Sequence, residues 1–119
     1  MRDYRKLRAF ELADDLAVWI YRATTGFPRE EIYGLTAQMR RAAVSIPSNI
    51  VEGCARDSQP DFLRFLFMSF GSLKELRYQV DLSHRLGFLS SQNLSVLEPK
   101  LSEAEKVVNG LIRAVRNDC

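Results

Sequence analysis

The sequence is poor in the residue types that mark disulfide scaffolds, zinc sites and membrane spans. Its 119 residues include two cysteines, Cys54 and the terminal Cys119, and a single histidine. Such a set forms neither a disulfide framework nor a zinc motif. No run of about 18 uncharged apolar residues occurs, and the N-terminal stretch is charged throughout, unlike a secretory signal peptide. We therefore expect a soluble, cytoplasmic protein with reduced thiols, no metal and no membrane association.

Sequence motifs of catalysis are also missing. The chain contains no GxSxG, HExxH, Walker or dinucleotide-binding pattern. The single histidine, His84, falls close to the apolar stripe of a predicted helix, where a packed or surface role is commoner than a catalytic one. Adjacent acids such as Asp14 and Asp15 point in different directions on a helix. We therefore predict no catalytic residue, no cofactor and no enzymatic activity.

The composition that remains is that of an ordinary globular domain, with 46% hydrophobic and 27% charged residues. A chain of this length fits one domain, residues 1–119, and buries roughly two-thirds of its unfolded surface. Seventeen basic and fifteen acidic residues give a net charge of +2. This charge is milder than that of a typical nucleic-acid-binding domain, so composition alone does not indicate a function.

Apolar residues recur at spacings of three and four, and no segment alternates as a strand does. The pattern predicts four helices, over about residues 6–25, 31–55, 59–87 and 91–117. We expect Gly26 and Gly87 to end helices and Pro47 to kink the second helix. Ser58 is the expected cap of the third helix, and Ser90 and Ser91 are the candidate caps of the fourth. The last helix either includes Pro99 or begins there. Short turns imply antiparallel neighbours, and hence an all-α, up-down-up-down four-helix bundle.

The most regular apolar stripe lies in the last predicted helix. It steps by three and four in a heptad register. Its members are Leu94, Leu97, Leu101, Ala104, Val108, Leu111 and Val115. We expect all of them to face the core.

Two helices carry more apolar residues than one core stripe requires. In the helix over residues 59–87, Phe67 and Phe70 lie off the core face, and in the helix over residues 31–55, Val44 and Val51 lie opposite the main stripe. A helix that is apolar nearly all round must be buried nearly all round. We therefore predict a homo-oligomer that uses these four residues as its interface. The alternative is a wider core that absorbs them.

Polar residues form a second pattern on the two central helices. Arg41, Ser45 and Glu52 share one side of the helix over residues 31–55, and Asn49 lies beside them. Arg64 and Glu75 project from the next helix on a similar side. Buried charges occur only when they are paired. We expect a structural network with Arg41–Glu75 and Arg64–Glu52 pairs, and the alternative is a functional site.

Several stretches resemble a known family. They are Phe27–Gly53, the residues Phe62, Phe65 and Leu66, the segment Gly71–Leu76, and the closing turn Leu86–Leu89. The long first stretch looks like the signature of the bacterial four-helix bundle proteins, also called the S23 or 23S rRNA intervening-sequence protein family. The resemblance implies a four-helix bundle that assembles into a homopentamer. It also implies similarity to the accessory variability determinant of diversity-generating retroelements, whose branch binds nucleic acid and a reverse transcriptase through a basic surface.

Thirteen of the seventeen cations are arginines, the residue that grips phosphate with two parallel hydrogen bonds. A ring of copies would multiply any basic patch, and binding would then follow from counterion release. The predicted phosphate contacts are Arg2, Arg5, Lys6, Arg8, Arg29 and Arg40. The leading hypothesis is a non-catalytic protein that associates with RNA or DNA. The alternative is a structural scaffold that binds a protein partner and no nucleic acid.

Overall fold

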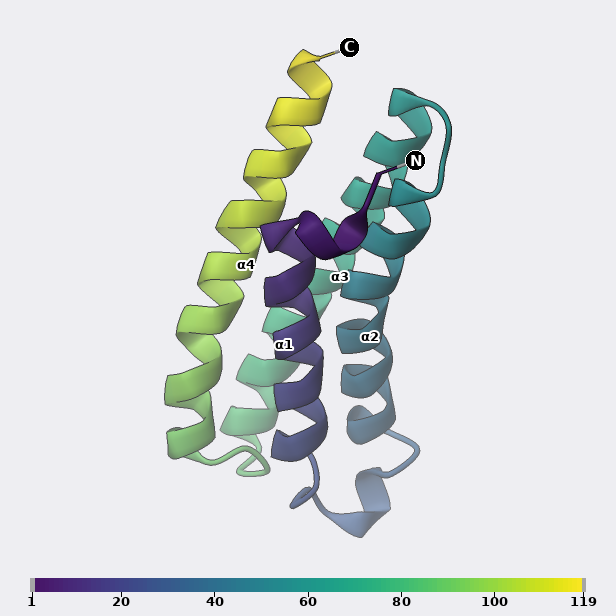
Figure 1. The fold of residues 1–119 in the computed structure, drawn as a ribbon. Coiled ribbons are helices and arrows are strands. Elements are labelled where there is room, and N and C mark those ends of the chain that lie inside the picture. Colours follow the sequence, from purple (N-terminus) through teal and green to yellow (C-terminus); the bar gives the residue numbers. More distant parts are fainter. Residues whose placement is uncertain (1, 119) are drawn as a thin grey trace.

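The computed structural model describes residues 2–118, and all the regular secondary structure within these residues is helical. Two short 3-10 helices, Tyr4–Lys6 and Arg29–Glu31, accompany four α-helices: α1 (Arg8–Ala23), α2 (Leu35–Cys54), α3 (Gln59–Arg85) and α4 (Ser91–Asn117). Successive helices run in opposite directions, and both chain ends lie at the same end of the bundle (Figure 1). Each helix packs on its sequence neighbours, and α4 also packs on α1. The predicted all-helical, four-helix fold is confirmed.

Side chains and one glycine set the helix ends as the sequence indicates. Ser58 accepts a hydrogen bond from the Asp61 amide and caps α3, and Ser90 accepts one from the Asn93 amide and caps α4. Gly87 has a φ of 82°, a left-handed conformation that glycine adopts without strain. The amide of the next residue, Phe88, reaches back to the Ser83 carbonyl at 2.9 Å. This is the Schellman closure of a helix.

The structure corrects two predicted boundaries. Helix α1 ends at Ala23, and Gly26 does not have positive φ, so Gly26 is not the left-handed stop. Helix α2 begins at Leu35, because residues 29–34 form a 3-10 turn followed by an irregular turn. The Glu31 carboxylate accepts a hydrogen bond from the Leu35 amide at 3.0 Å. A side chain outside the helix therefore fixes its start, which the periodicity of apolar residues does not reveal.

Both internal prolines are accommodated within continuous helices. Helix α2 runs through Pro47 and α4 begins at Ser91, well before Pro99. The hydroxyl of Ser69 on α3 donates to the Ile46 carbonyl at 2.9 Å, beside Pro47. The carbonyl that loses its helical donor to Pro47 is that of Ala43, four residues earlier. The Ser69 bond therefore ties α3 to α2 and does not replace the missing backbone donor.

The core consists of one buried stripe from each helix, including Leu16, Met39, Leu73 and Leu101. In α4 five members of the predicted stripe are buried, and Leu94 and Leu111 are half-buried and pack against the core. Ile112, which was not predicted, is buried beside Leu111. A strict seven-residue repeat drifts by about 20° per heptad on a straight helix. The drift has moved the buried position by one residue at the C-terminal end of α4.

Helices α2 and α3 approach closely at Gly53. A Cβ atom placed there would lie 2.9 Å from the Phe65 Cβ and 3.1 Å from the Phe62 Cδ1. Only glycine therefore permits this crossing. The contact brings the start of α3, with its phenylalanines, against the end of α2.

Candidate nucleic-acid interface

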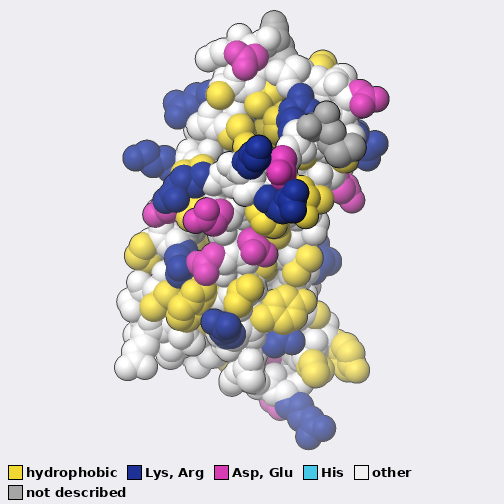
Figure 2. All heavy atoms as spheres, viewed as in Figure 1, with side chains coloured by type: hydrophobic (Ala, Val, Ile, Leu, Met, Phe, Trp, Pro, Cys, Tyr) yellow, Lys and Arg dark blue, Asp and Glu magenta, His cyan; other side chains and the backbone are white. Residues whose placement is uncertain are grey.

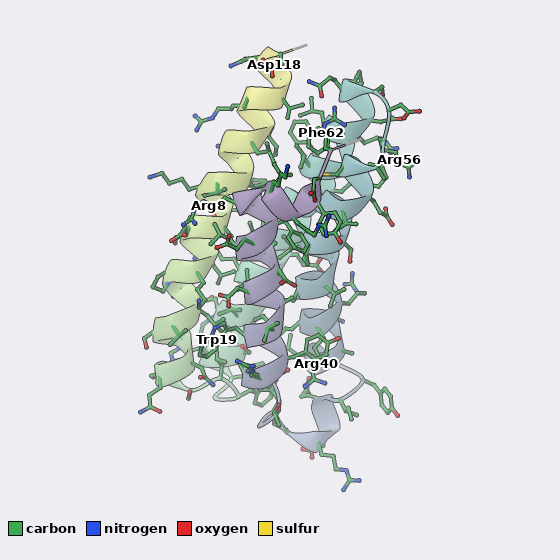
Figure 3. All side chains as sticks on the ribbon, viewed as in Figure 1. Arg8, Trp19, Arg40, Arg56, Phe62 and Asp118 are labelled. Carbon is green, nitrogen blue, oxygen red and sulfur yellow. The ribbon has the colours of Figure 1, made fainter. Side chains whose placement is uncertain are left out.

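Four arginines stack on three phenylalanines at the bundle end that holds both termini. We call this set the Arg–Phe cluster; its members are Arg2, Arg56, Arg64 and Arg116 with Phe62, Phe65 and Phe67. The guanidinium carbons lie between 4.1 and 5.2 Å from the ring centroids. The arginines come from the N-terminal segment, the α2–α3 turn, α3 and α4, whereas all three rings come from the first turns of α3. Figure 3 shows Arg56 and Phe62 at this end.

Arg2 fastens the N-terminal segment to the α2–α3 turn. Its amide donates to the Cys54 carbonyl and its Nη1 donates to the Arg56 carbonyl, both at 3.2 Å. Its Nη2 donates to the Gln59 side chain, and its guanidinium lies 4.1 Å from the Phe62 centroid. Arg2 therefore has a structural role in building the cluster.

Arg56 and Arg116 present the most available guanidinium groups of the cluster. Both residues are exposed, and neither has a carboxylate partner within residues 2–118. Arg64 pairs with Asp61 at 3.8 Å across exposed side chains, a contact that contributes little. A guanidinium stacked on a ring keeps its N–H edge available, and that edge fits two phosphate oxygens at once. The rings thus orient the arginines without neutralising them.

Formal charge is unevenly distributed along the bundle. Residues 2–8, 52–65 and 110–118, which form this end, hold eight cations and five carboxylates. The rest of the chain holds nine cations and ten carboxylates. The end that carries the Arg–Phe cluster is therefore basic, although the whole chain is nearly neutral.

The face formed by α1 and α4 is balanced in charge. Arg8 pairs with Glu103, and Lys100 pairs with Asp15 at 2.6 Å. In Figure 2 basic and acidic side chains are interspersed over this face, with hydrophobic side chains between them. Arg8, one of the predicted phosphate contacts, therefore lies in an ion pair on a mixed surface.

The other predicted phosphate contacts do not form one patch. Arg5 pairs with Asp3 at 3.1 Å, and this hydrogen-bonded pair lowers the pKa of Asp3 and raises that of Arg5. Lys6 is exposed near them. Arg29 and Arg40 lie at the opposite end of a bundle 45 Å long (Figure 3). The six residues predicted as one surface are therefore divided between the two ends.

The predicted polar network is present in part. Arg41 and Glu75 form an ion pair at 3.1 Å, and the hydroxyls of Ser45 and Ser72 are 2.8 Å apart. Asn49 donates to the Ser45 carbonyl at 2.9 Å. The Arg41–Glu75 and Ser45–Ser72 contacts join α2 to α3, and the Asn49 bond lies within α2.

The expected Arg64–Glu52 pair is wrong. Arg64 pairs with Asp61 on its own helix, and Glu52 is exposed. Asp61 lies three residues before Arg64, one helical turn away on the same face of α3. That local pairing takes the place of the predicted contact between helices.

A denser network between α3 and α4 was not predicted. Arg77 Nη1 donates to Glu98 and Nη2 donates to the Ser102 hydroxyl, at 3.1 and 2.9 Å. Its Nε donates to Glu105, which also pairs with Lys74. The bond to Glu105 raises the pKa of Arg77. No sequence feature indicates this network, because its partners on α3 and α4 are more than 20 residues apart and each is an ordinary surface residue.

Two apolar surfaces lie on opposite faces of the bundle. One is a groove of about 480 Å³ lined by Pro60, Leu63, Arg64, Phe67 and Met68. Because Phe67 also contacts Arg116 of α4, the groove faces the α3–α4 side. Phe67 and Met68 are exposed by 44% and 46%.

The second surface follows the α1–α2 groove, where a hollow of about 410 Å³ is lined by the apolar residues Phe10, Pro47 and Val51 and by the polar residues Asp14, Ser48 and Glu52. Val44, one turn before Pro47 on α2, is 41% exposed. Of the four predicted interface residues, Phe67 and Val44 are exposed and Val51 is half-buried. Phe70 is also half-buried and packs against the core, as the wider-core alternative expected.

The residues considered for catalysis do not converge. His84 contacts the Ser91 hydroxyl at 3.2 Å beside the α3–α4 turn. Cys54 is buried, and burial raises the pKa of its thiol. Cys119 lies outside the described residues.

Between residues 2 and 118 no three His, Cys, Asp or Glu side chains are placed to hold a metal ion. Within the same residues no helix combines the length and apolarity needed to cross a membrane.

Comparison with known proteins gives a family and a fold. Residues 5–110 match the model of the 23S rRNA-intervening sequence proteins. A crystal structure from Bacteroides thetaiotaomicron, described as a protein of unknown function from the S23 ribosomal protein family, superposes with a TM-score of 0.80. It is 21% identical, and the match covers 88% of this chain and 95% of that one. No curated protein matches the chain. Because the family model spans most of its length, this chain belongs to the 23S rRNA-intervening sequence protein family.

Proposed function

We propose that the protein binds the phosphate backbone of RNA or DNA through the Arg–Phe cluster and has no catalytic role. The observation that carries the proposal is the pair of exposed, ring-stacked guanidinium groups without carboxylate partners, Arg56 and Arg116. They lie at the basic end of the bundle. Phosphate contacts of this kind supply affinity without reading sequence. The family's association with 23S rRNA intervening sequences is consistent with such a role.

One protomer offers few phosphate contacts, so we propose that a ring of copies makes the binding surface. The apolar surfaces differ in composition and lie on opposite faces, around Phe67 and around Val44. A contact between two different patches is heterologous, and it closes into a ring when the rotation permits. The ring would be the homopentamer that the family resemblance implies. It would bring five copies of the Arg–Phe cluster to one rim.

The nucleic-acid proposal is tested by fluorescence anisotropy with short single-stranded RNA and DNA at increasing salt. The test variant is the double substitution Arg56→Gln and Arg116→Gln. The control, Arg22→Gln with Lys106→Gln, removes the same charge from exposed residues outside the cluster. Each lost phosphate contact lowers the slope of log K against log salt by about one unit. The test variant removes two arginines, so we expect the slope to decrease by about two units for each protomer that contacts the nucleic acid. For the control we expect little change in the slope.

Two results would count against this function. Equal losses in both double variants would show that overall charge, and not the Arg–Phe cluster, governs binding. No binding at low salt would remove the nucleic-acid function altogether. The second candidate function would then stand, namely a scaffold that binds a protein such as a reverse transcriptase. Its binding site would be the apolar groove beside Phe67. The lining of that groove includes one charged residue, Arg64.

The ring is tested separately by light scattering. We expect wild type to have a mass several times 13.6 kDa. Phe67→Asp and Val44→Asp each place a charge on one of the two apolar surfaces and should release the protomer. Tyr33→Asp is the control, because Tyr33 is 94% exposed and lies on neither surface. A wild-type mass near that of one chain would contradict the ring.

A further inference from the structure

A second basic site lies at the opposite end of the bundle, below the α1–α2 turn. A cavity of about 240 Å³ opens there between the end of α1 and the start of α2. Its lining includes Thr24, Thr25, Phe27, Arg29, Thr36 and Arg40. Two arginines and three threonines therefore line one space, and no carboxylate lines it among the described residues. The Thr24 and Thr25 hydroxyls already donate to carbonyls of α1. Figure 3 shows Arg40 at this end, far from Arg56.

Arg40 is held rigidly by the end of α1. Its Nε donates to the Thr24 hydroxyl at 2.9 Å, and its Nη2 donates to the Tyr21 carbonyl at 3.3 Å. The guanidinium also lies 4.7 Å from the centroid of the Tyr21 ring. Its Nη1 has no partner within residues 2–118. Since the other contacts fix the plane of the group, the Nη1 donors are oriented before any ligand arrives.

Thr36 adds a polar group that the protein itself leaves unused. The residue is only 6% exposed, yet its hydroxyl makes no hydrogen bond within the described chain. The oxygen is not sealed inside the core, since the only fully enclosed side-chain atom without a partner in residues 2–118 is Gln79 Oε1. Thr36 lines the cavity, and its hydroxyl oxygen is not fully enclosed, so the hydroxyl is available to a ligand in the cavity.

The start of α2 strengthens the same site. Glu31 accepts from the Leu35 amide, but Gly34 provides no side-chain cap. The amides of Thr36 and Ala37 therefore lack acceptors within residues 2–118. The N-terminus of a helix favours negative charge, because its amides and its dipole point toward the ligand. The Glu31 carboxylate does not line the cavity.

The geometry points to a binding site for a phosphate group in this cavity. Arg40 Nη1, Arg29 and the Thr36 hydroxyl supply the charge-assisted and neutral donors that a tetrahedral oxyanion accepts. The volume lies below the range of about 300–1,000 Å³ typical of sites for drug-sized ligands, so the site suits the phosphate and not a large organic group. The ligand is either free phosphate or the terminal phosphate of a nucleotide chain.

A purely structural role accounts for only part of this arrangement. Capping the end of α1 explains the Nε and Nη2 contacts of Arg40. It does not explain why a second arginine and an unused buried hydroxyl face the same space.

The test is a titration of ¹⁵N-labelled full-length protein with inorganic phosphate at constant ionic strength, observed by NMR. We expect saturable shifts at the amides of Thr25, Thr36 and Ala37. Thr36→Val keeps the shape of the side chain and should weaken binding about tenfold, as expected for loss of a hydrogen bond to a charged group. Thr36→Ser should restore it. Arg29→Gln should also weaken binding, whereas Arg22→Gln, at an exposed arginine outside the cavity, should not.

Further arms identify the source of the phosphate and separate this site from the proposed function. A 5′-phosphorylated dinucleotide that shifts the same amides, while its unphosphorylated counterpart does not, would identify a terminal phosphate; shifts with inorganic phosphate alone would identify the free ion. The Arg56→Gln and Arg116→Gln double variant should bind inorganic phosphate as wild type does. Absence of saturable shifts with either probe, or unchanged binding in Thr36→Val, would overturn the site.

Discussion

Replacing Gln79 by methionine should stabilise the protein. Gln79 lies on α3 with 4% of its surface exposed, and its Oε1 is enclosed without a hydrogen-bond partner. Its Nε2 donates to Glu75 over a long 3.3 Å contact. The side chain therefore occupies the interior at the cost of one unsatisfied acceptor.

The expected gain follows from two opposing contributions. An unsatisfied buried acceptor costs about 1–3 kcal/mol. The Nε2 bond to the Glu75 carboxylate, at 3.3 Å beyond the usual range, contributes less than the about 1.5–3 kcal/mol of a well-formed hydrogen bond to a charged group. Methionine has a similar length and a similar helix propensity, and its thioether fills an apolar site well. Glu75 keeps its ion pair with Arg41. The Gln79→Met variant should therefore gain about 1 kcal/mol in the free energy of unfolding.

The assay is thermal and urea denaturation at one fixed protein concentration, because assembly would make the transition concentration-dependent. A gain of about 1 kcal/mol corresponds to a rise in Tm of about 3–5 °C for a chain of this size. Gln38→Met at an exposed α2 position is the control and should change stability by less than about 0.5 kcal/mol. A loss of about 1 kcal/mol or more in Gln79→Met would refute the reasoning, since it would mean that Oε1 is hydrogen-bonded in solution.

Three further substitutions test other contacts. Gly53→Ala should lower the free energy of unfolding by about 1–3 kcal/mol in urea denaturation, because the new methyl group would overlap Phe65. Glu105→Gln should lower it by about 1 kcal/mol, because the bond to Arg77 loses its charge, and added salt should reduce the difference. Burial raises the pKa of Cys54, so the unfolded chain releases the thiol proton first. Stability should then fall as pH rises above the ordinary thiol pKa of 9.0, and this fall should be smaller in Cys54→Ala.

The Gly53→Ala and Glu105→Gln variants each have a matched control. Gly71→Ala, at an exposed helical position with no atom within 4 Å, should raise stability by about 0.5–1 kcal/mol. Asp81→Asn breaks the exposed pair with Arg85 and should cost about 0.3–0.5 kcal/mol. A Gly53→Ala variant as stable as wild type would contradict the close α2–α3 crossing. Equal costs for Glu105→Gln and Asp81→Asn would contradict the stronger α3–α4 network.

Local sequence features accounted for most of the fold. The caps Ser58 and Ser90, the stop at Gly87 and the apolar periodicity depend on residues within a few positions of one another. The errors occurred where apolar periodicity was not the deciding feature. Glu31 sets the start of α2, and the accumulated drift of α4 buries Ile112 more fully than Leu111.

The sequence by itself determined four amphipathic helices, their order and the family signature, because helical periodicity and capping are local properties. Only the tertiary structure decided which charges meet. It separated Arg29 and Arg40 from the N-terminal cations by the length of the bundle, and it brought Arg56 and Arg116, 60 positions apart, onto neighbouring phenylalanines of α3. The sites depend on such pairings, because the residues next to a long side chain in the sequence do not indicate which distant helix that side chain will contact.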